Sequence, residues 1–172
     1  ALLGDAAAAV IVEPSQGNDR SKLLHWNMKT WPEGATLTEV RGGGTHKHPQ
    51  DPLTVLEDNL FRMDGPKIYK MARKHVYDML NDDLKRMGIK RDDITLLVPH
   101  QASGLAVKAY IKYGKFKSEQ VMDIISYTGN CVAASLPLAL AIAHEEKRFK
   151  RGDLLYFIGT GAGLSVASTL IR

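Results

Sequence analysis

Short apolar runs alternate with helical patterns through the second part of the chain, and this alternation limits the possible folds more than any other feature. From residue 64 onward, the patterns predict the order α-β-α-β-α-β-β. A chain of this kind builds a mostly parallel sheet with helices on both faces. The last two strands, 154–158 and 164–171, share the glycine-rich turn 159–163 and are expected to be antiparallel. The expected fold class is therefore α/β, with a mixed, mostly parallel sheet.

Capping residues mark the ends of the first predicted helix. Asp64 is placed to cap its start, Pro66 falls in its first turn, and Gly88 is a natural stop. Apolar residues recur at helical spacing between these points. The other predicted helices cover 103–113 and 133–148, and the other predicted strands cover 94–98 and 121–125.

The chain before residue 64 is less regular. An apolar run at 6–13 is typical of a buried strand, and further strands are expected at 23–31 and 59–63. Residues 32–54 contain several glycines and prolines and are predicted to form a long loop. Loops of this length are usually functional or mobile.

The composition is that of a soluble globular domain. The chain has 172 residues, of which 44% are apolar and 24% are charged. Its one cysteine, Cys131, excludes an internal disulfide and fits a reducing compartment, so a cytoplasmic location is expected. No apolar run has the length of a membrane span. The net charge of +4 includes a basic cluster at 147–151, which we interpret as a solvated helix end rather than a nucleic-acid site.

Two polar side chains follow predicted strands where those strands end. His100 comes directly after an apolar strand and Pro99, and Asn130 follows the next strand through a loop that contains Gly129. The carboxyl ends of strands in an open α/β sheet form a shared cleft. A neutral imidazole and an amide could each donate a hydrogen bond to one oxygen there, as stabilisation of an enolate requires. On these residues alone, a structural role for His100 is the stronger interpretation.

Three other features have simpler interpretations. The segment Gly161-Ala162-Gly163 lies between two strands, so it predicts a tight hairpin and not a dinucleotide-binding turn, which opens a helix. His46 and His48 form an H-x-H pair without a third ligand nearby, which favours a solvated loop and no metal site. Cys131 is interpreted as a small buried residue at a helix start.

Five segments resemble, in order, motifs of the β-ketoacyl-ACP synthase III family of thiolase-fold condensing enzymes. They are GDAAAAVIVE at 4–13, MDGPKIYKMA at 63–72, VPHQAS at 98–103, TGNCVAASLPLAL at 128–140 and FIGTGAGLSVASTLIR at 157–172. The thirty positions between His100 and Asn130 also agree with the spacing in that family. The chain is similar to the C-terminal half of such an enzyme, and since it does not begin with Met, we expect it to be part of a longer polypeptide.

The resemblance implies a domain organisation and a reaction. Residues 1–13 would hold the last strand of the N-terminal half, 14–63 the connecting strands and a mobile loop, and 64–172 the C-terminal catalytic half-domain. The N-terminal half would supply a nucleophilic cysteine and act as the partner, and the complete enzyme would be a homodimer. The implied reaction is a decarboxylating Claisen condensation of an acyl thioester with a malonyl thioester. Acyl-CoA and the malonyl thioester are its substrates, and no cofactor is expected.

The same resemblance implies roles for individual residues. His100 and Asn130 would be catalytic and would hold the malonyl thioester oxygen as it becomes an enolate. The backbone N–H of Ala162 would belong to the oxyanion hole of the acyl-transfer step. Thr160 and Gly161 would line the substrate pocket. The isolated chain is expected to be inactive, because Cys131 does not occupy the position of the family's nucleophile.

Several positions depart from the family pattern. Ser103 stands where the family has asparagine, Thr160 replaces a bulky aromatic residue, and Leu105 occupies the place of an arginine that helps to dock acyl carrier protein. Lys108, one turn later, is a speculative substitute in carrier docking. Two alternatives therefore stay open: an acyltransferase that joins acyl chains or acylates an alcohol or amine, and a non-catalytic partner half of a split enzyme.

Overall fold

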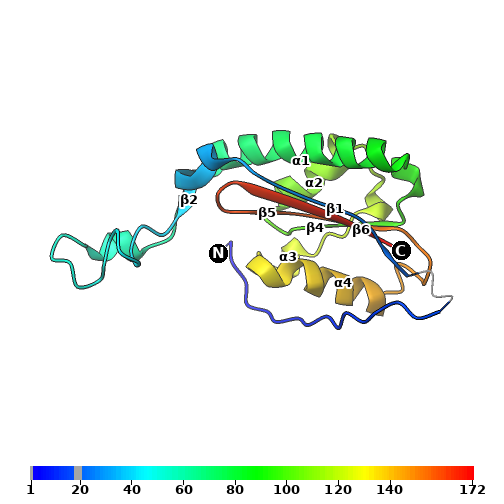
Figure 1. Cartoon of the computed structure of the whole chain (residues 1–172), viewed down its shortest axis with the longest axis horizontal. Coiled ribbons are helices and arrows are strands. Elements are labelled where there is room, and N and C mark those ends of the chain that lie inside the picture. The colour runs from blue at the N-terminus through cyan, green and yellow to red at the C-terminus, as the bar shows by residue number, and fades with distance from the viewer. Residues whose placement is uncertain (1, 18–20) are drawn as a thin grey trace.

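A four-stranded sheet forms the centre of the molecule in the computed structural model, which describes residues 2–17 and 21–172 (Figure 1). Its strands lie in the order β1-β6-β5-β4. Their bounds are Leu23–Thr30 for β1, Leu96–Pro99 for β4, Leu155–Gly161 for β5 and Ser165–Ile171 for β6. The predicted strands at 23–31, 94–98, 154–158 and 164–171 are therefore confirmed, with shifted ends.

The direction of the strands confirms a mixed sheet. β4 pairs with β5 in parallel, whereas β6 is antiparallel to both β5 and β1. Consequently β1, β4 and β5 run in one direction and β6 opposes them. Because β6 lies between β1 and β5, two of the three neighbouring pairs are nevertheless antiparallel. The carboxyl ends of β1, β4 and β5 meet at one edge of the sheet.

Helices cover both faces of the sheet, as predicted. α1 (Gly65–Met87) and α2 (Gly104–Lys112) lie on one face, and α3 (Ile125–Thr128) and α4 (Ser135–Glu145) lie on the other (Figure 1). Each layer has its own apolar core. The first includes Leu80, Val107 and Ile158, and the second includes Val98 and Ala139. Among the described residues, no helix has both the length and the apolar character needed to cross a membrane.

The ends of α1 follow the predicted capping. The Asp64 carboxylate accepts a hydrogen bond from the Lys67 backbone N–H at 3.2 Å. Pro66 lies in the first turn, where the absence of an N–H has no cost. Gly88 adopts φ +63°, a left-handed conformation that glycine tolerates best, and closes the helix.

An extended arm lies between β2 and β3 in the sequence, before α1. β2 (Thr38–Glu39) and β3 (Arg62–Met63) form a two-stranded antiparallel sheet, from which the intervening residues project away from the body (Figure 1). The strand predicted at 59–63 is thus reduced to two residues, and the loop predicted at 32–54 begins with a short helical turn. The 3-10 turns of the described chain are Pro32–Leu37, Leu56–Asn59, Arg91–Asp93, Ser118–Gln120 and Val132–Ala134.

Two predicted strands do not form in the described part of the chain. Residues 6–13 are exposed and belong to no strand, because no described strand lies beside them to complete their hydrogen bonds. The segment 121–125 forms only an isolated parallel bridge between Val121 and Leu97. Helix α3 begins at Ile125, so the extended stretch ends before a ladder can continue.

A buried carboxylate ties α1 to three strands. Asp83 of α1 is 1% exposed and accepts hydrogen bonds from Tyr156 Oη at 2.7 Å and Ser168 Oγ at 2.5 Å. Two further donors come from β1, namely Asn27 Nδ2 at 2.8 Å and His25 Nε2 at 2.9 Å. Burial alone raises the pKa of Asp83, but the four hydrogen bonds together hold that pKa below its ordinary value. The network fixes the rotation of α1 against the sheet.

Candidate active site

His100 lies at the carboxyl end of β4, where the sequence placed it. Its backbone N–H donates to Ile158 O of β5 at 2.8 Å, which extends the parallel pairing by one residue. A Cβ added to Gly159 would meet His100 Cβ at 3.7 Å and Leu136 Cδ1 of α4 at 3.5 Å. His100 therefore packs beside Gly159, close to the first turn of α4.

The electrostatic state of His100 suits a neutral hydrogen-bond donor. Burial lowers the pKa of its imidazole below the ordinary value, because the charged form loses its hydration. Within the described chain, neither ring nitrogen is hydrogen-bonded to another residue. A neutral ring at this strand end can therefore offer an N–H to a bound molecule.

Asn130 follows α3 through a turn that requires glycine. Gly129 has φ +68°, and a Cβ there would lie 3.0 Å from the Gly4 backbone nitrogen. The Asn130 side-chain Oδ1 accepts a hydrogen bond from the Val132 backbone N–H at 2.9 Å. This bond fixes the orientation of the amide and leaves its NH2 group without a partner among the described residues. The Asn130 backbone also bonds to the N-terminal segment, through Leu2 O at 3.0 Å and the Gly4 N–H at 3.1 Å.

Gln101 was missed as a site residue. It is fully buried, and its amide Nε2 donates to Pro99 O at 2.9 Å and to Met122 O at 3.0 Å. Its Oε1 accepts from the Ile124 backbone N–H at 3.1 Å. An amide side chain directly after His100, next to a buried strand, was the available signal. It joins the loop of His100 to the segment that leads towards Asn130.

The glycine-rich hairpin lies at the same edge of the sheet. Thr160 and Gly161 belong to β5, so the turn comprises only residues 162–164 and is shorter than predicted. Gly161 and Ala162 are exposed, and a Cβ added at Gly161 would have no neighbour within 4 Å. Since Pro99 pairs with Ile158, the ends of β4 and β5 bring His100 and this turn to one edge. The approach of His100, Asn130 and Ala162 to one shared oxygen stays a prediction.

Cys131 is engaged within its own loop. It is 7% exposed, and its thiol donates to Thr128 O at 3.3 Å. A buried thiol of this kind behaves as a packing residue. The exposed His46 and His48 lie on the projecting arm, and the described residues contain no group of three potential metal ligands.

Helices α1 and α2 carry a basic surface. Ser103 caps α2 by accepting from the Ala106 N–H at 3.2 Å, and both Lys108 and Leu105 on this helix are exposed. Tyr113 joins the two helices, because Arg73 of α1 lies 5.4 Å from its ring centroid and Lys112 of α2 lies 5.3 Å from it. Cations of α1 and α2 therefore share one face.

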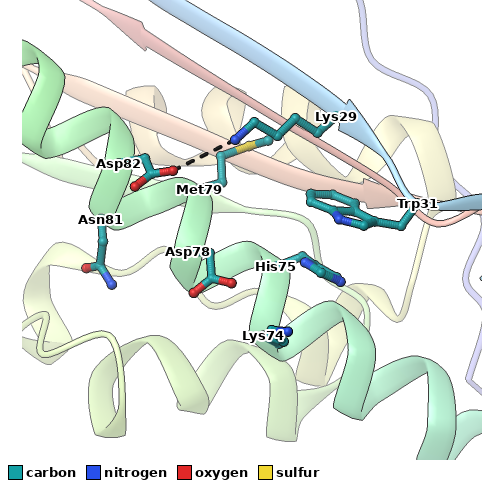
Figure 2. Close-up of a pocket in the computed structure, with 8 residues that line it drawn as sticks. All are labelled: Lys29, Trp31, Lys74, His75, Asp78, Met79, Asn81 and Asp82. Carbon is teal, nitrogen blue, oxygen red and sulfur yellow. Dashed lines mark ion pairs between the residues drawn. The ribbon is translucent and has the colours of Figure 1, made fainter.

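A separate depression of about 420 Å³ lies between β1 and α1 (Figure 2). Trp31 stacks on His75 with ring centroids 3.9 Å apart, and Lys29 pairs with Asp82 at 3.8 Å. Its lining contains no cysteine, serine or threonine that could accept an acyl group, and none of the predicted site residues. Its lining residues are Lys29, Trp31, Lys74, His75, Asp78, Met79, Asn81 and Asp82.

Comparison with known proteins gives a consistent result. The family profile described as 3-oxoacyl-[acyl-carrier-protein] synthase III C terminal matches residues 84–172. The β-ketoacyl-[acyl-carrier-protein] synthase III of Agrobacterium fabrum is 30% identical over 175 residues, which cover 99% of this chain and 51% of the relative. The corresponding protein of Brucella suis is 31% identical with the same coverage. The chain thus spans about half the length of these relatives.

Solved structures with similar names share the fold. The crystal structure of 3-oxoacyl-(acyl carrier protein) synthase III from Pseudomonas aeruginosa has a TM-score of 0.74 and 30% sequence identity, and the match covers 87% of this chain and 44% of that one. The structure from Aquifex aeolicus has a TM-score of 0.77 and 27% identity, covering 92% and 46%. The fold described above is therefore the thiolase-like fold that the sequence predicted.

Proposed function

Because the chain belongs to the 3-oxoacyl-[acyl-carrier-protein] synthase III family, we propose that it is the C-terminal half of a decarboxylating condensing enzyme. The proposed reaction joins an acyl thioester to a malonyl thioester with loss of CO2. One observation carries the proposal: a partly buried imidazole whose pKa is lowered by desolvation follows strand β4, and an amide whose NH2 group has no partner among the described residues follows the turn after α3. These are the two donors that an enolate oxygen requires.

The condensation step assigns roles to His100 and Asn130. As the bond between the malonyl α-carbon and its carboxylate breaks, the electron pair moves onto the α-carbon and the thioester oxygen, and CO2 departs. The His100 ring N–H and the Asn130 Nδ2–H donate to that oxygen. Negative charge develops there only as CO2 leaves, so fixed donors stabilise the transition state more than the bound substrate.

Acyl transfer requires a nucleophile from outside these 172 residues. Its cysteine thiolate takes the acyl group from CoA, and the enolate carbon then attacks the acyl-cysteine carbonyl and releases the thiolate. The Ala162 backbone N–H, in the exposed turn after β5, would hold the oxygen of the tetrahedral intermediate. Thr160 and Gly161 would border the acyl group. The proposed steps need only protein side chains, backbone N–H groups and the two thioester substrates, so no cofactor is proposed.

The basic face of α1 and α2 supports an anionic carrier as the malonyl donor. Arg73 and Lys112 lie against the same Tyr113 ring, and Lys108 is exposed on α2. Acyl carrier protein would dock there through Lys108 in place of an arginine at position 105. Basic faces of this kind raise the association rate of acidic partners. The free thiol of Cys131 fits a cytoplasmic location. The homodimer is proposed from the family alone.

The test separates the two half-reactions in the complete enzyme. Asn130→Ala is expected to lower malonyl decarboxylation and condensation by about 10²–10³, the usual cost of one lost oxyanion donor. Acylation of the cysteine should stay within about tenfold of the parent, because backbone N–H groups hold its oxyanion. Asn81→Ala is the matched control, since it removes an exposed amide on α1 that bonds to Arg91. It should leave both half-reactions unchanged.

The outcomes distinguish the proposal from its alternatives. If the Asn130→Ala enzyme decarboxylates malonyl thioester normally while it remains folded, the assigned role is wrong. An enzyme that transfers acyl groups without consuming malonyl thioester would be an acyltransferase that joins acyl chains or acylates an alcohol or amine. A complex in which neither half-reaction depends on His100 or Asn130 would be one in which this half is a non-catalytic partner.

A further inference from the structure

The side-chain amide of Gln101 makes three hydrogen bonds that join two separate backbone segments. The side chain is 0% exposed. Its NH2 group donates to Pro99 O and Met122 O, and its carbonyl oxygen accepts from the Ile124 N–H, at 2.9, 3.0 and 3.1 Å respectively. Pro99 immediately precedes His100, whereas Met122 and Ile124 lead into α3 and the turn that carries Asn130. The side chain of Gln101 therefore links the residue before His100 to the segment that leads to Asn130.

These bonds replace a β-ladder that stops too early. β4 pairs with the segment after residue 120 only through the bridge of Leu97 with Val121 and the bond from Met122 N–H to Leu97 O at 2.9 Å. Beyond that point Pro99 has no N–H to donate. Without a further polar link, the end of β4 would be held to the segment before α3 by apolar packing, which includes Val98, Met122 and Ile124. The amide of Gln101 supplies that link where the backbone provides none.

We infer that Gln101 is a positioning residue, which holds the loop of His100 at a fixed distance from the segment before Asn130. This inference rests on the proposed function, because it assigns Gln101 a role through those two donors. Gln101 itself is fully buried, and its three side-chain hydrogen bonds all go to backbone groups. Misplacement of a catalytic group by about 1 Å can cost about 10²-fold in rate, so a buried clamp of this kind affects catalysis as well as folding.

The chain contains a matched control for a purely structural role. Gln120 is 8% exposed, and its NH2 group donates to Arg91 O at 2.9 Å and Ile94 O at 2.6 Å. Its carbonyl oxygen accepts from the Lys117 N–H at 3.0 Å. Gln120 thus makes three backbone hydrogen bonds, as Gln101 does, and joins the same two parts of the chain. The bonds of Gln120 reach residues before β4, at the opposite end of this strand from His100.

The experiment compares substitutions of Gln101 and Gln120 in the complete enzyme. Gln101→Met and Gln120→Met each remove one buried amide while they keep an unbranched side chain of similar size. Gln101→Met is expected to lower kcat for malonyl decarboxylation by about 10–100-fold with an unchanged KM, as misplaced donors would. Gln120→Met should keep kcat within about threefold for a similar loss of Tm. His100→Ala is measured beside them.

Each result decides between clear alternatives. If His100→Ala decarboxylates normally, the proposed function fails. If His100→Ala is impaired but Gln101→Met retains the parent kcat, or loses kcat only in proportion to Tm as Gln120→Met does, the positioning role is overturned. Should Gln101→Met fail to fold, Gln101→Glu is judged by the same criteria, since it keeps the side-chain shape and an acceptor for Ile124. In a folded variant, faster hydrogen exchange of the Ile124 amide together with shifted His100 ring resonances supports the clamp, and unchanged values of both contradict it.

Discussion

Replacing Asp83 by alanine should destabilise the protein more than any change on the exposed face of α1. The carboxylate accepts four hydrogen bonds, and its loss leaves all four donors without that acceptor. Two of the donors, Tyr156 and Ser168, are 1% and 3% exposed, so water cannot replace the lost bonds. His25 and Asn27 are only partly buried, and hydration can compensate there.

The magnitude follows from the two buried donors. A buried polar group left without a partner costs about 1–3 kcal/mol, so two such groups predict a loss of about 2–6 kcal/mol in the free energy of unfolding. Asp82→Ala is the matched control at the neighbouring position. Asp82 is 54% exposed and pairs with Lys29 at 3.8 Å, and exposed ion pairs contribute only about 0–1 kcal/mol.

The pH dependence supplies a second, independent readout. The pKa of Asp83 in the folded protein lies below its ordinary value of 3.8, so the carboxylate contributes stability fully above pH 3.8. That contribution is lost as the pH falls through the lowered pKa of the folded state. Asp83→Asn cannot titrate. The difference in stability between the parent and Asp83→Asn should therefore become smaller as the pH falls below about 4.

Urea-induced unfolding measures both effects. Trp31 stacks on His75 of α1, so its fluorescence reports whether the helix is docked on the sheet. The reasoning is refuted if Asp83→Ala unfolds within about 1 kcal/mol of Asp82→Ala, which would leave no special cost for buried donors. It is also refuted if the stability difference between the parent and Asp83→Asn does not become smaller as the pH falls below about 4.

Three further predictions concern the site and the packing around it. The isolated chain should form no covalent adduct with labelled acyl-CoA, because the Cys131 thiol is buried and donates within its own loop; a stoichiometric adduct by mass spectrometry would reverse this assignment. An NMR titration should give His100 a midpoint below 6.5, because burial lowers its pKa, and a midpoint above that value would contradict the neutral ring. Gly34→Ala should lower stability by about 1–3 kcal/mol through overpacking, since the new Cβ would lie 2.7 Å from the Leu164 nitrogen; a thermal melt equal to the parent would exclude this clash.

Local signals made much of the fold predictable. Asp64 and Gly88 delimit α1 through capping, which acts within a few residues and can be read from sequence. The position of His100 followed from an apolar run that ends in proline. The segment 6–13 has an equally strong local pattern, yet it forms no strand here. Pairing depends on a neighbour, and the pattern of one segment does not contain that information.

The residues that hold the site in place were harder to predict for the same reason. Asp83 has the helical spacing of the buried face, four positions after Met79, so its burial could have been anticipated. Its partners could not, because they are 56 to 85 positions away in the sequence. Gln101 stands next to a residue that was recognised, but its partners Met122 and Ile124 are more than twenty positions away.

The place of β6 in the sheet has a consequence for the synthesis of the chain. Strand β6 is synthesised after the other three strands of this sheet, yet it lies between β1 and β5, and Thr30 meets Ser165 across 135 positions of sequence. Until then β1 has no partner in this sheet, and its backbone N–H and C=O groups stay available to wrong pairing. Such long-range pairing is intrinsically slow. A nascent chain that stalls before residue 165 would therefore hold an unpaired β1, which makes residues 165–171 decisive for whether the sheet assembles.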